Sequence, residues 1–382
     1  MDKLRVGVLG ATGAAGLEFI RALDVHPWFN VVELYASKKS ADKTLEKACS
    51  LDVSDISANI RQMKVQAIGE IDPDLDLICS ALPSEVARDA EAYCAQHTPV
   101  ISTASDFRYE PDVPVIITEV NAGHYPLLEL QKQRGWNGWI APGPNCTTVG
   151  LVMSLAPLYK EVGIERVAMT SSQAISGGGY GLIQLWNQQR QSLLKNGNVN
   201  LPEPLSGIEQ PIDTLDIVLD GNIIGDIKGE VEKVKKETIK ILGDYGGGEI
   251  YPANFLIDCQ CTRVPTLRGH FESVFVETKS DCSPSDLKRI YHAFNSRVRG
   301  EFGDLPSSPR QTIVVLDRSP QPYYDANLQR GMAAVVGMIN PTDLFRHGLK
   351  YQVLSNNTEK GAAKGMVQVA EYLYKIGFLK AK

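Results

Sequence analysis

The sequence predicts an α/β protein in which a doubly wound parallel sheet is followed by an α+β domain with a mixed sheet. Three observations favour this class. The 382 residues exceed the size of one ordinary domain, so two are expected. The chain opens with an apolar run, a glycine-rich turn and an amphipathic stretch. Further apolar runs then alternate with helical stretches through the first half, which is typical of a parallel sheet.

The composition excludes several classes of protein. Hydrophobic residues make up 43% of the chain and charged residues 22%, as in a soluble protein with a large core. The net charge of -6 argues against nucleic acid as a partner. No apolar run reaches the roughly 18 residues that span a bilayer, and the N-terminus lacks the pattern of a signal peptide. Seven cysteines in no paired framework favour a reduced, cytoplasmic protein.

The N-terminal glycine turn predicts a nucleotide-binding βαβ unit. LRVGVL at 4–9 predicts a strand, and the apolar spacing of 17–27 predicts a helix. Between them, Gly10 and Gly13 allow a tight turn close to a pyrophosphate, and Gly16 allows the helix to pack on the strand. The free N–H groups of the helix N-terminus favour phosphates. The alternative is a glycine turn without a ligand. We expect the cofactor to contact Gly10, Thr12, Gly13, Ala14 and Ala15.

The end of the second predicted strand favours NADP over NAD. That strand covers 31–37, and an NAD-binding domain usually ends it with an acidic residue that binds the ribose 2′-hydroxyl. Here two lysines and two serines follow instead: Ser37, Lys38, Lys39 and Ser40. Two cations and two hydroxyls suit a 2′-phosphate. The alternative is a solvated lysine turn.

Three more strands complete the predicted parallel sheet, at 75–83, 98–105 and 112–121. The stretch SEVARDAEAYCAQH predicts a helix between the first two of these strands. Ligands of doubly wound sheets bind beyond the carboxyl ends of the strands. The side chains expected near that edge are Ser80, Ser105 and Arg108.

Cys146 is the candidate nucleophile. Residues 139–159 predict a strand, a Pro/Gly turn and a helix, and Cys146 falls in the turn, at or just before the helix. The helix dipole and nearby N–H donors favour a thiolate there. The same N–H groups, with the Asn145 amide, would form an oxyanion hole. The alternative is a buried structural cysteine, which is the usual fate of a free thiol.

The second half contains two strands that predict a hairpin. NFLIDCQCTRV and FESVFVET both read as strands, and the turn-like PTLRG joins them. A hairpin would bring Arg263 and His270 together across its mouth. Cys259 and Cys261 alternate on the first of these strands, but no further ligands stand at suitable spacing, so no metal is expected.

Five motifs occur in the order of one known family: GATGAAG, PNCTT, SQAISGGGY at 172–180, TRVPTLRGH at 262–270 and NNTEKGAA at 356–363. The chain resembles aspartate-semialdehyde dehydrogenase, in its archaeal and fungal branch, over nearly its whole length. The resemblance implies an NADP-dependent oxidoreductase. Its reaction would be the reductive dephosphorylation of β-aspartyl phosphate to aspartate β-semialdehyde, through a thioester on Cys146, in aspartate-family amino-acid biosynthesis.

The resemblance also assigns roles to single residues. Gln173 would help to position the acyl group, Arg263 would bind the substrate α-carboxylate, and His270 would be the general acid/base. Glu230 and Lys233 would bind the substrate amino group and the phosphate. Alone, these two read as an ordinary solvated pair on a helix. The remaining expected contacts are Arg108 to phosphate, Asn357 to the nicotinamide carboxamide, and Ser176 and Gly177 to the cofactor.

The expected domains follow from the same comparison. A Rossmann-type domain would span 1–149 and be completed by 355–382, and a catalytic and dimerisation domain would span 150–354. An insertion at about 181–212 would hold an added helix, QLWNQQRQSLL, and a proline-rich loop, LPEPLSGIEQP, that cover the site or extend an interface. A homodimer or homotetramer is expected.

Three alternatives remain open at the level of sequence. An acyl-CoA reductase such as malonyl-CoA reductase would use the same thiol. N-acetylglutamyl-phosphate reductase is disfavoured because Glu230 suits a free ammonium group. A non-catalytic NADP-binding paralogue is disfavoured by the complete set of reactive residues.

Overall fold

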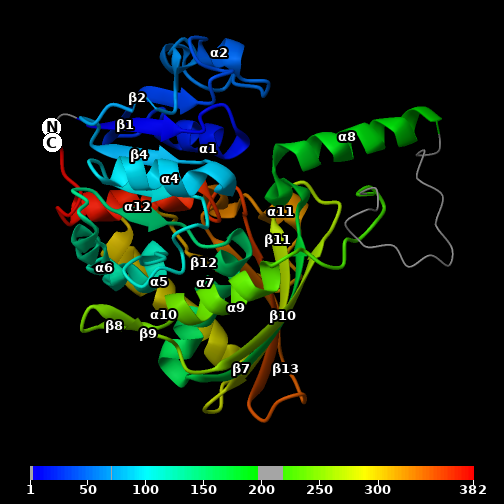
Figure 1. Ribbon diagram of the computed structural model, residues 1–382. Helices are drawn as coiled ribbons and strands as arrows, with labels where there is room; N and C mark the ends of the chain where they lie inside the picture. Colours follow the sequence, from blue (N-terminus) through cyan, green and yellow to red (C-terminus); the bar gives the residue numbers. More distant parts are fainter. Residues whose placement is uncertain (1–2, 70, 197–217) are drawn as a thin grey trace.

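The computed structural model describes residues 3–69, 71–196 and 218–382, and these form two six-stranded sheets with helices packed around them (Figure 1). The first sheet has the order β3-β2-β1-β4-β5-β6, and all its pairs are parallel. This is the doubly wound order, in which the crevice beyond the strand ends receives a ligand. Its strands are β1 (Leu4–Leu9), β2 (Phe29–Ala36), β3 (Val65–Ala67), β4 (Leu77–Ser80), β5 (Val100–Ser102) and β6 (Ile140–Pro142).

Two hydrophobic clusters hold helices to this sheet. One joins α1 (Ala14–Leu23) and α12 (Ala363–Lys375) to the strands, and the other joins α4 (Ser84–Ala95). The C-terminal helix therefore packs with the N-terminal strands, beside α1. The domain limits at 149 and 354 stay predictions. The short helices of this half are α2 (Leu45–Ala48), α3 (Ala58–Arg61), α5 (Thr118–Asn121), η1 (Ala122–His124), α6 (Leu127–Leu130) and η2 (Gln131–Arg134).

The prediction of a strand at 112–121 is wrong. The segment is extended but joins no sheet, and its last residues form α5. Its buried backbone is satisfied by a side chain instead. Ile117 N–H donates to Asn121 Oδ1 at 2.8 Å, and Asn121 Nδ2 donates to the Val115 carbonyl at 2.8 Å. A buried chain needs hydrogen-bond partners but not strand neighbours, so an apolar run alone does not predict sheet membership.

The second sheet is mixed, with the order β10-β7-β11-β14-β13-β12. Its strands are β7 (Ile164–Gln173), β10 (Leu256–Arg263), β11 (His270–Thr278), β12 (Ile313–Val315), β13 (Ala334–Pro341) and β14 (Gly348–Ser355). A separate pair is formed by β8 (Asp244–Gly246) and β9 (Glu249–Tyr251). The other elements of this half are α7 (Cys146–Val162), η3 (Ile175–Gly178), α8 (Gly179–Asn196), α9 (Glu230–Ile241), α10 (Pro284–Phe302), α11 (Pro322–Asp325) and η5 (Leu328–Gly331).

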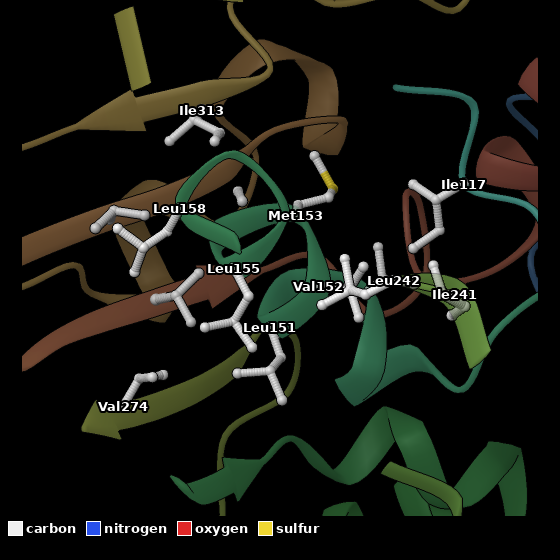
Figure 2. Packing of buried hydrophobic residues seen from close by; sticks show 14 of the residues in the cluster. Ile117, Leu151, Val152, Met153, Leu155, Leu158, Ile241, Leu242, Val274 and Ile313 are labelled. Carbon is white, nitrogen blue, oxygen red and sulfur yellow. The ribbon is translucent and has the colours of Figure 1, made fainter. Parts of the chain in front are cut away.

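Helix α7 lies at the centre of the second core. Figure 2 shows Leu151 and Leu155 on the side of Val274 in β11, whereas Val152 points toward Leu242 at the end of α9. Most of its side chains are buried, so packing on several sides fixes the position of its first residue, Cys146.

The prediction of a hairpin is wrong, but Arg263 and His270 do lie close together, as that prediction implied. Strand β7 lies between β10 and β11, parallel to the first and antiparallel to the second. The connection 264–269 passes over the end of β7, where Val264 N–H donates to the Gln173 carbonyl at 3.0 Å and Ile175 N–H to the Thr266 carbonyl at 2.8 Å. Two short strands joined by a turn need not pair when a third strand fits between them.

The added helix predicted in the insertion is confirmed. It is part of α8, which projects away from the body of the molecule (Figure 1). Trp186 anchors its first half by packing on Ile175 and Leu219 and by donating to Asp220 Oδ1 at 2.9 Å. The proline-rich loop predicted at 201–211 lies outside the described residues. Among the helices that the structure describes, none combines the length and apolar character of a membrane span.

Candidate active site

A cavity of about 660 Å³ is lined by residues from both halves of the chain. Its wall includes the carboxyl-edge segments of the first sheet, the start of α7 and the start of α9. Most of the predicted site residues line it: Ala14, Ala15, Arg108, Asn145, Cys146, Gln173, Ser176, Gly177, Glu230, Lys233, Arg263 and Asn357.

The candidate nucleophile is the first residue of α7, as the sequence predicts. Asn145 caps the helix, and its Oδ1 accepts from Thr147 N–H at 2.9 Å and from Thr148 N–H at 3.2 Å. Cys146 Sγ lies 3.2 Å from Nε2 of His270, the first residue of β11. The thiol therefore stands at a helix N-terminus with an imidazole in contact.

The tautomer of His270 follows from its other ring nitrogen. Ala174 N–H donates to Nδ1 at 3.0 Å, so Nδ1 is an acceptor. In the neutral ring the proton is then on Nε2 and faces the sulfur. Burial, followed by the charge of Arg263, lowers the pKa of His270 to about 3, so the ring is neutral at physiological pH. The imidazole presents a hydrogen-bond donor to Cys146.

The resting protonation state of Cys146 differs from the expectation of a thiolate. Burial, followed by the negative charge of Glu230, raises the pKa of the thiol to about 12, and Arg263 and Arg108 oppose this only in part. Desolvation thus outweighs the helix N-terminus at this site, because the charged form loses water in the closed pocket. The group that meets the substrate is a neutral thiol.

Arg263, Gln173 and Gly177 form one wall of the site. Arg263 ends β10 and donates from Nη1 to the Ala174 carbonyl at 2.9 Å and to Gln173 Oε1 at 3.5 Å. A Cβ added to Gly177 would lie 2.7 Å from Arg263 Nη1 and 3.0 Å from His270 Cε1. Only glycine lets this backbone approach both side chains. Burial lowers the pKa of Arg263, whose guanidinium faces the cavity.

Glu230 is the centre of a hydrogen-bond network. Its Oε1 accepts from Asn145 Nδ2 at 2.9 Å, from Gln173 Nε2 at 3.1 Å and from Thr147 Oγ1 at 3.3 Å. Lys233 Nζ lies 3.8 Å from Oε2. The Asn145 amide is thus used for capping through its oxygen and for Glu230 through its nitrogen. Both ends of this side chain have protein partners, and its expected part in an oxyanion hole stays a prediction.

Arg108 lines the cavity and is held in place by two hydrogen bonds. The side chain is buried, with Nη1 3.0 Å from Glu237 Oε1 and Nη2 3.1 Å from the Thr103 carbonyl. Its Nε is buried without a hydrogen-bond partner among the described residues. A buried guanidinium N–H without a partner is costly, but Nε has almost no exposed surface, so the contact of Arg108 with phosphate stays a prediction.

The glycine turn fits a dinucleotide. Gly10 has φ +77, and a Cβ on Gly16 would lie 2.1 Å from the Gly10 carbonyl oxygen. Gly13 is the N-cap of α1 and has no side chain to cap it, so the first N–H groups stay open. Ala14 and Ala15 of that first turn line the cavity, whereas Gly10, Thr12 and Gly13 shape the turn before it. These residues suit a pyrophosphate.

The other residues expected to contact the cofactor differ in whether they line the cavity. Ser37 to Ser40 form a turn after β2 in which both lysines are exposed, and none of the four lines the cavity. Ser80 is fully buried and donates to Glu91 Oε1 at 2.6 Å, so its hydroxyl braces the protein and does not face the cofactor. Asn357 does line the cavity. Its Nδ2 donates to Ser176 Oγ at 2.8 Å, and its Oδ1 accepts from Gly269 N–H at 2.9 Å.

Comparison with known proteins agrees with this geometry. Residues 5–126 match the family model described as semialdehyde dehydrogenase, NAD binding domain, and residues 155–360 match the model described as semialdehyde dehydrogenase, dimerisation domain. An aspartate-semialdehyde dehydrogenase of Methanothermobacter thermautotrophicus is 36% identical over 98% of this chain and 99% of its own length. The chain belongs to the aspartate-semialdehyde dehydrogenase family.

A solved structure supports the same assignment. The aspartate-semialdehyde dehydrogenase of Candida albicans, crystallised with NADP, superimposes with a TM-score of 0.80 at 30% identity and covers 99% of this chain and 100% of its own. A malonyl-CoA reductase (NADP) of Metallosphaera sedula is 30% identical over 98% of this chain and 98% of its own length. This family therefore includes relatives with different acyl leaving groups.

Sequence reasoning missed several residues at the site of this aspartate-semialdehyde dehydrogenase family member. Glu237 is paired with Arg108, and its signal was an acidic residue at helical spacing from Val234 and Ile241 on the buried face of α9. Tyr180 and Ile183 of α8 line the cavity, and Ile183 falls within the expected insertion. Arg268 and Lys360 also line it, and both occur inside motifs from which only other residues were assigned roles. Among the described residues no group of three or more His, Cys, Asp or Glu could hold a metal ion.

Proposed function

We propose that this protein catalyses the NADPH-dependent reductive dephosphorylation of β-aspartyl phosphate to aspartate β-semialdehyde, through a thioester on Cys146. One observation carries the proposal. The thiol at the start of α7 is 3.2 Å from His270 Nε2, inside a cavity that Arg108, Lys233 and Arg263 also line. A nucleophile beside several cations suits a small acyl substrate with several negative charges.

The charged groups of the cavity match those of the substrate. Arg263 would bind the α-carboxylate with its planar guanidinium. Glu230 would bind the ammonium group, exchanging part of its present network for the ligand. Arg108 and Lys233, which both line the cavity, would bind the phosphate. The carboxylate and the phosphate of the substrate would therefore each meet a cation.

The thiol chemistry follows from the protonation states. Cys146 attacks the acyl carbon, its proton passes to the departing phosphate, and a thioester remains. The Cys146 N–H in the first turn of α7 faces the oxyanion, since Asn145 takes the N–H groups that follow. His270 donates from Nε2 to the sulfur and stabilises it when it leaves as thiolate. We therefore narrow the expected acid/base role of His270 to that of a hydrogen-bond donor.

The residues for NADP fit that cofactor. The turn of Gly10 to Ala15 would hold the pyrophosphate at the start of α1, and the exposed Lys38 and Lys39 would bind the 2′-phosphate. Ser176, Gly177 and Asn357 line the cavity near Cys146 and would contact the nicotinamide end. When bound, NADPH supplies the hydride that reduces the thioester to the aldehyde level.

The two candidate substrates, an acyl-CoA and an acyl phosphate, differ in their leaving group. Both would use Cys146 and His270, but the cations Arg108 and Lys233, which line the same cavity as the thiol, suit a small phosphate leaving group. The proposal therefore expects turnover with the acyl phosphate or, in reverse, with phosphate and the semialdehyde. Faster turnover with malonyl-CoA would reassign the substrate and leave the thioester mechanism intact.

The direct test is an assay with aspartate semialdehyde, phosphate and NADP in which the appearance of NADPH is followed. Cys146→Ala should abolish turnover while NADP affinity stays within about twofold of the wild type, because the thiol is not part of the cofactor turn. Retained turnover in Cys146→Ala would exclude the thioester. Stoichiometric acylation of Cys146 by the substrate would exclude a non-catalytic NADP-binding role.

We further propose a cytoplasmic homo-oligomer, a dimer or a tetramer. The match of 155–360 to a dimerisation domain supports self-association. All seven cysteines are free thiols, which suits a reducing compartment. Size-exclusion chromatography with light scattering would distinguish the two assemblies.

A further inference from the structure

Helix α9 carries two buried carboxylates on one face. Residues 230, 234, 237 and 241 follow helical spacing, and all four are buried. Two of them are apolar, as expected for a packed face, and two are acidic. Glu230 belongs to the substrate site described above. Glu237 is fully buried two turns further on, with no role in the proposed chemistry.

Glu237 contacts the site at two points. Its Oε1 lies 3.0 Å from Arg108 Nη1 and 3.3 Å from Tyr109 Oη. Its Oε2 accepts from Asn145 N–H at 2.5 Å. Asn145 is therefore held from both ends by one helix: its side-chain amide by Glu230 and its backbone by Glu237.

One turn later the same helix holds the segment that carries Arg108. Lys240 Nζ donates to the Arg108 carbonyl at 2.7 Å and to the Glu110 carbonyl at 3.0 Å. Arg108 is thus fixed by its backbone and by two of its guanidinium nitrogens, which leaves Nε as the donor without a partner among the described residues. A side chain fixed in this way keeps one position in the wall of the cavity that it lines.

We propose that Glu237 is a positioning residue that holds Arg108 for the phosphate and fixes the backbone step into Cys146. The inference rests on the proposed function, since it assigns the phosphate to Arg108. Both carboxylate oxygens are needed, because three donors converge on them: Arg108 Nη1, Tyr109 Oη and Asn145 N–H. A neutral amide at this position would offer one acceptor and turn a donor toward one of these N–H groups.

The test uses Glu237→Gln in the full chain, assayed in the direction that consumes phosphate. The KM for phosphate should rise about tenfold and kcat should fall about tenfold. The reason is that Glu237→Gln weakens both the hydrogen bond to the Arg108 guanidinium and the hydrogen bond to the Asn145 N–H, next to the nucleophile. The KM for NADP should stay within about twofold of the wild-type value, because the glycine turn expected to bind NADP lies between β1 and α1, in the other half of the chain. Glu232→Gln is the matched control, because Glu232 lies on the exposed face of the same helix.

Three outcomes separate the possibilities. A merely structural role would lower the melting temperature and raise all KM values together, which would overturn the inference. An unchanged KM for phosphate would overturn it as well. If Glu237→Gln does not fold, Glu237→Asp carries the test, because it keeps both oxygens and should raise only the KM for phosphate, by a few-fold. A wild type that forms no NADPH would instead refute the proposed function, whatever Glu237 does.

Discussion

The sulfur of Cys146 is a neutral thiol at physiological pH, and this governs how its reactivity responds to pH. Burial and the charge of Glu230 raise the pKa of this thiol to about 12. As long as the pH is below that value, each increase of one pH unit raises the thiolate fraction about tenfold. We expect the alkylation rate of Cys146 by iodoacetamide to rise with unit slope from pH 6 to 9. Peptide mass spectrometry separates Cys146 from the other cysteines. A plateau above pH 6 would instead show a stable thiolate–imidazolium pair.

The charge of Glu230 makes a second prediction about the same sulfur. A neighbouring carboxylate disfavours a thiolate, so removing its charge lowers the pKa of the thiol. Glu230→Gln should therefore speed alkylation of Cys146 by about three- to tenfold at pH 7.5. The same variant should lose turnover, because the substrate ammonium group loses its partner. Glu232→Gln, exposed on the same helix, should leave the alkylation rate unchanged.

The identities of the reactive residues could be predicted from sequence, but their protonation states could not. Cys146, Gln173, Arg263 and His270 lie in motifs and do meet at one cavity. The pKa values depend on how much water each group loses and on which charges approach it, and both come from tertiary packing. Glu237 was missed for a similar reason, because an acid on an amphipathic helix is usually a solvated residue.

At the scale of elements, two glycines at the turn between β1 and α1 should respond differently to substitution, because they differ in the space available for a side chain. A Cβ on Gly16 would lie 2.1 Å from a backbone oxygen, so Gly16→Ala must displace α1 and should cost more than about 2 kcal/mol in the free energy of unfolding. Gly13 has φ -88 and its Cβ would lie 3.3 Å from the same oxygen. Gly13→Ala should therefore cost less than about 1 kcal/mol. Chemical denaturation of both variants measures the difference.

The buried carboxyl of Glu91 joins α4 to the ends of β4 and β5. Ser80 and Ser102 donate to its Oε1 at 2.6 and 2.5 Å, and burial raises its pKa to about 7. Because the folded pKa exceeds the unfolded one, the native state holds the proton more tightly, and its stabilisation is lost as pH rises from about 4.5 to 7. Glu91→Gln keeps an acceptor for both serines and cannot ionise.

Glu91→Gln should therefore stabilise the protein by about 2–3 kcal/mol at pH 8 and by less than about 1 kcal/mol at pH 5. Denaturant unfolding at the two pH values measures the gain. Glu85→Gln, exposed on the same helix, should show no such pH dependence. Equal effects of Glu91→Gln at both pH values would contradict the assignment of the raised pKa.

Strand patterns predicted most elements but not which strands pair. The runs at 4–9, 31–37 and 75–83 became neighbours in the first sheet, because each is apolar and the crossovers between them are helical. The run at 112–121 has the same apolar character, yet the Asn121 side chain satisfies its backbone outside the sheet. In the second sheet, β7 separates the two strands expected to form a hairpin. The first outcome depends on a polar side chain inside the run itself, and the second on a strand that is distant in sequence.

At the scale of the whole molecule, a buried ionic network joins the elements around the first sheet to those of the second. Lys360 Nζ lies 2.5 Å from Glu119 Oε2 and 2.6 Å from Gln368 Oε1. Gln368 also donates to Glu119 Oε1 at 3.0 Å and to Ser308 Oγ at 3.1 Å, and Arg297 Nη2 donates to the Glu119 carbonyl at 3.2 Å. The network therefore connects α5 and α12 with α10 and the segment that follows it.

Breaking this network should destabilise the molecule as a unit. Lys360→Met leaves the Glu119 carboxylate buried without its cation, which should cost about 3–5 kcal/mol in the free energy of unfolding. Lys364→Met is the control, because Lys364 lies on the same segment and pairs with Glu359 at 3.3 Å in a partly exposed position, so it should cost less than about 1 kcal/mol. Adding Glu119→Gln to Lys360→Met removes the stranded charge and should recover at least about 2 kcal/mol. Additive losses in the double variant would mean that the two side chains act independently, and the ion pair would then not be what joins the two halves.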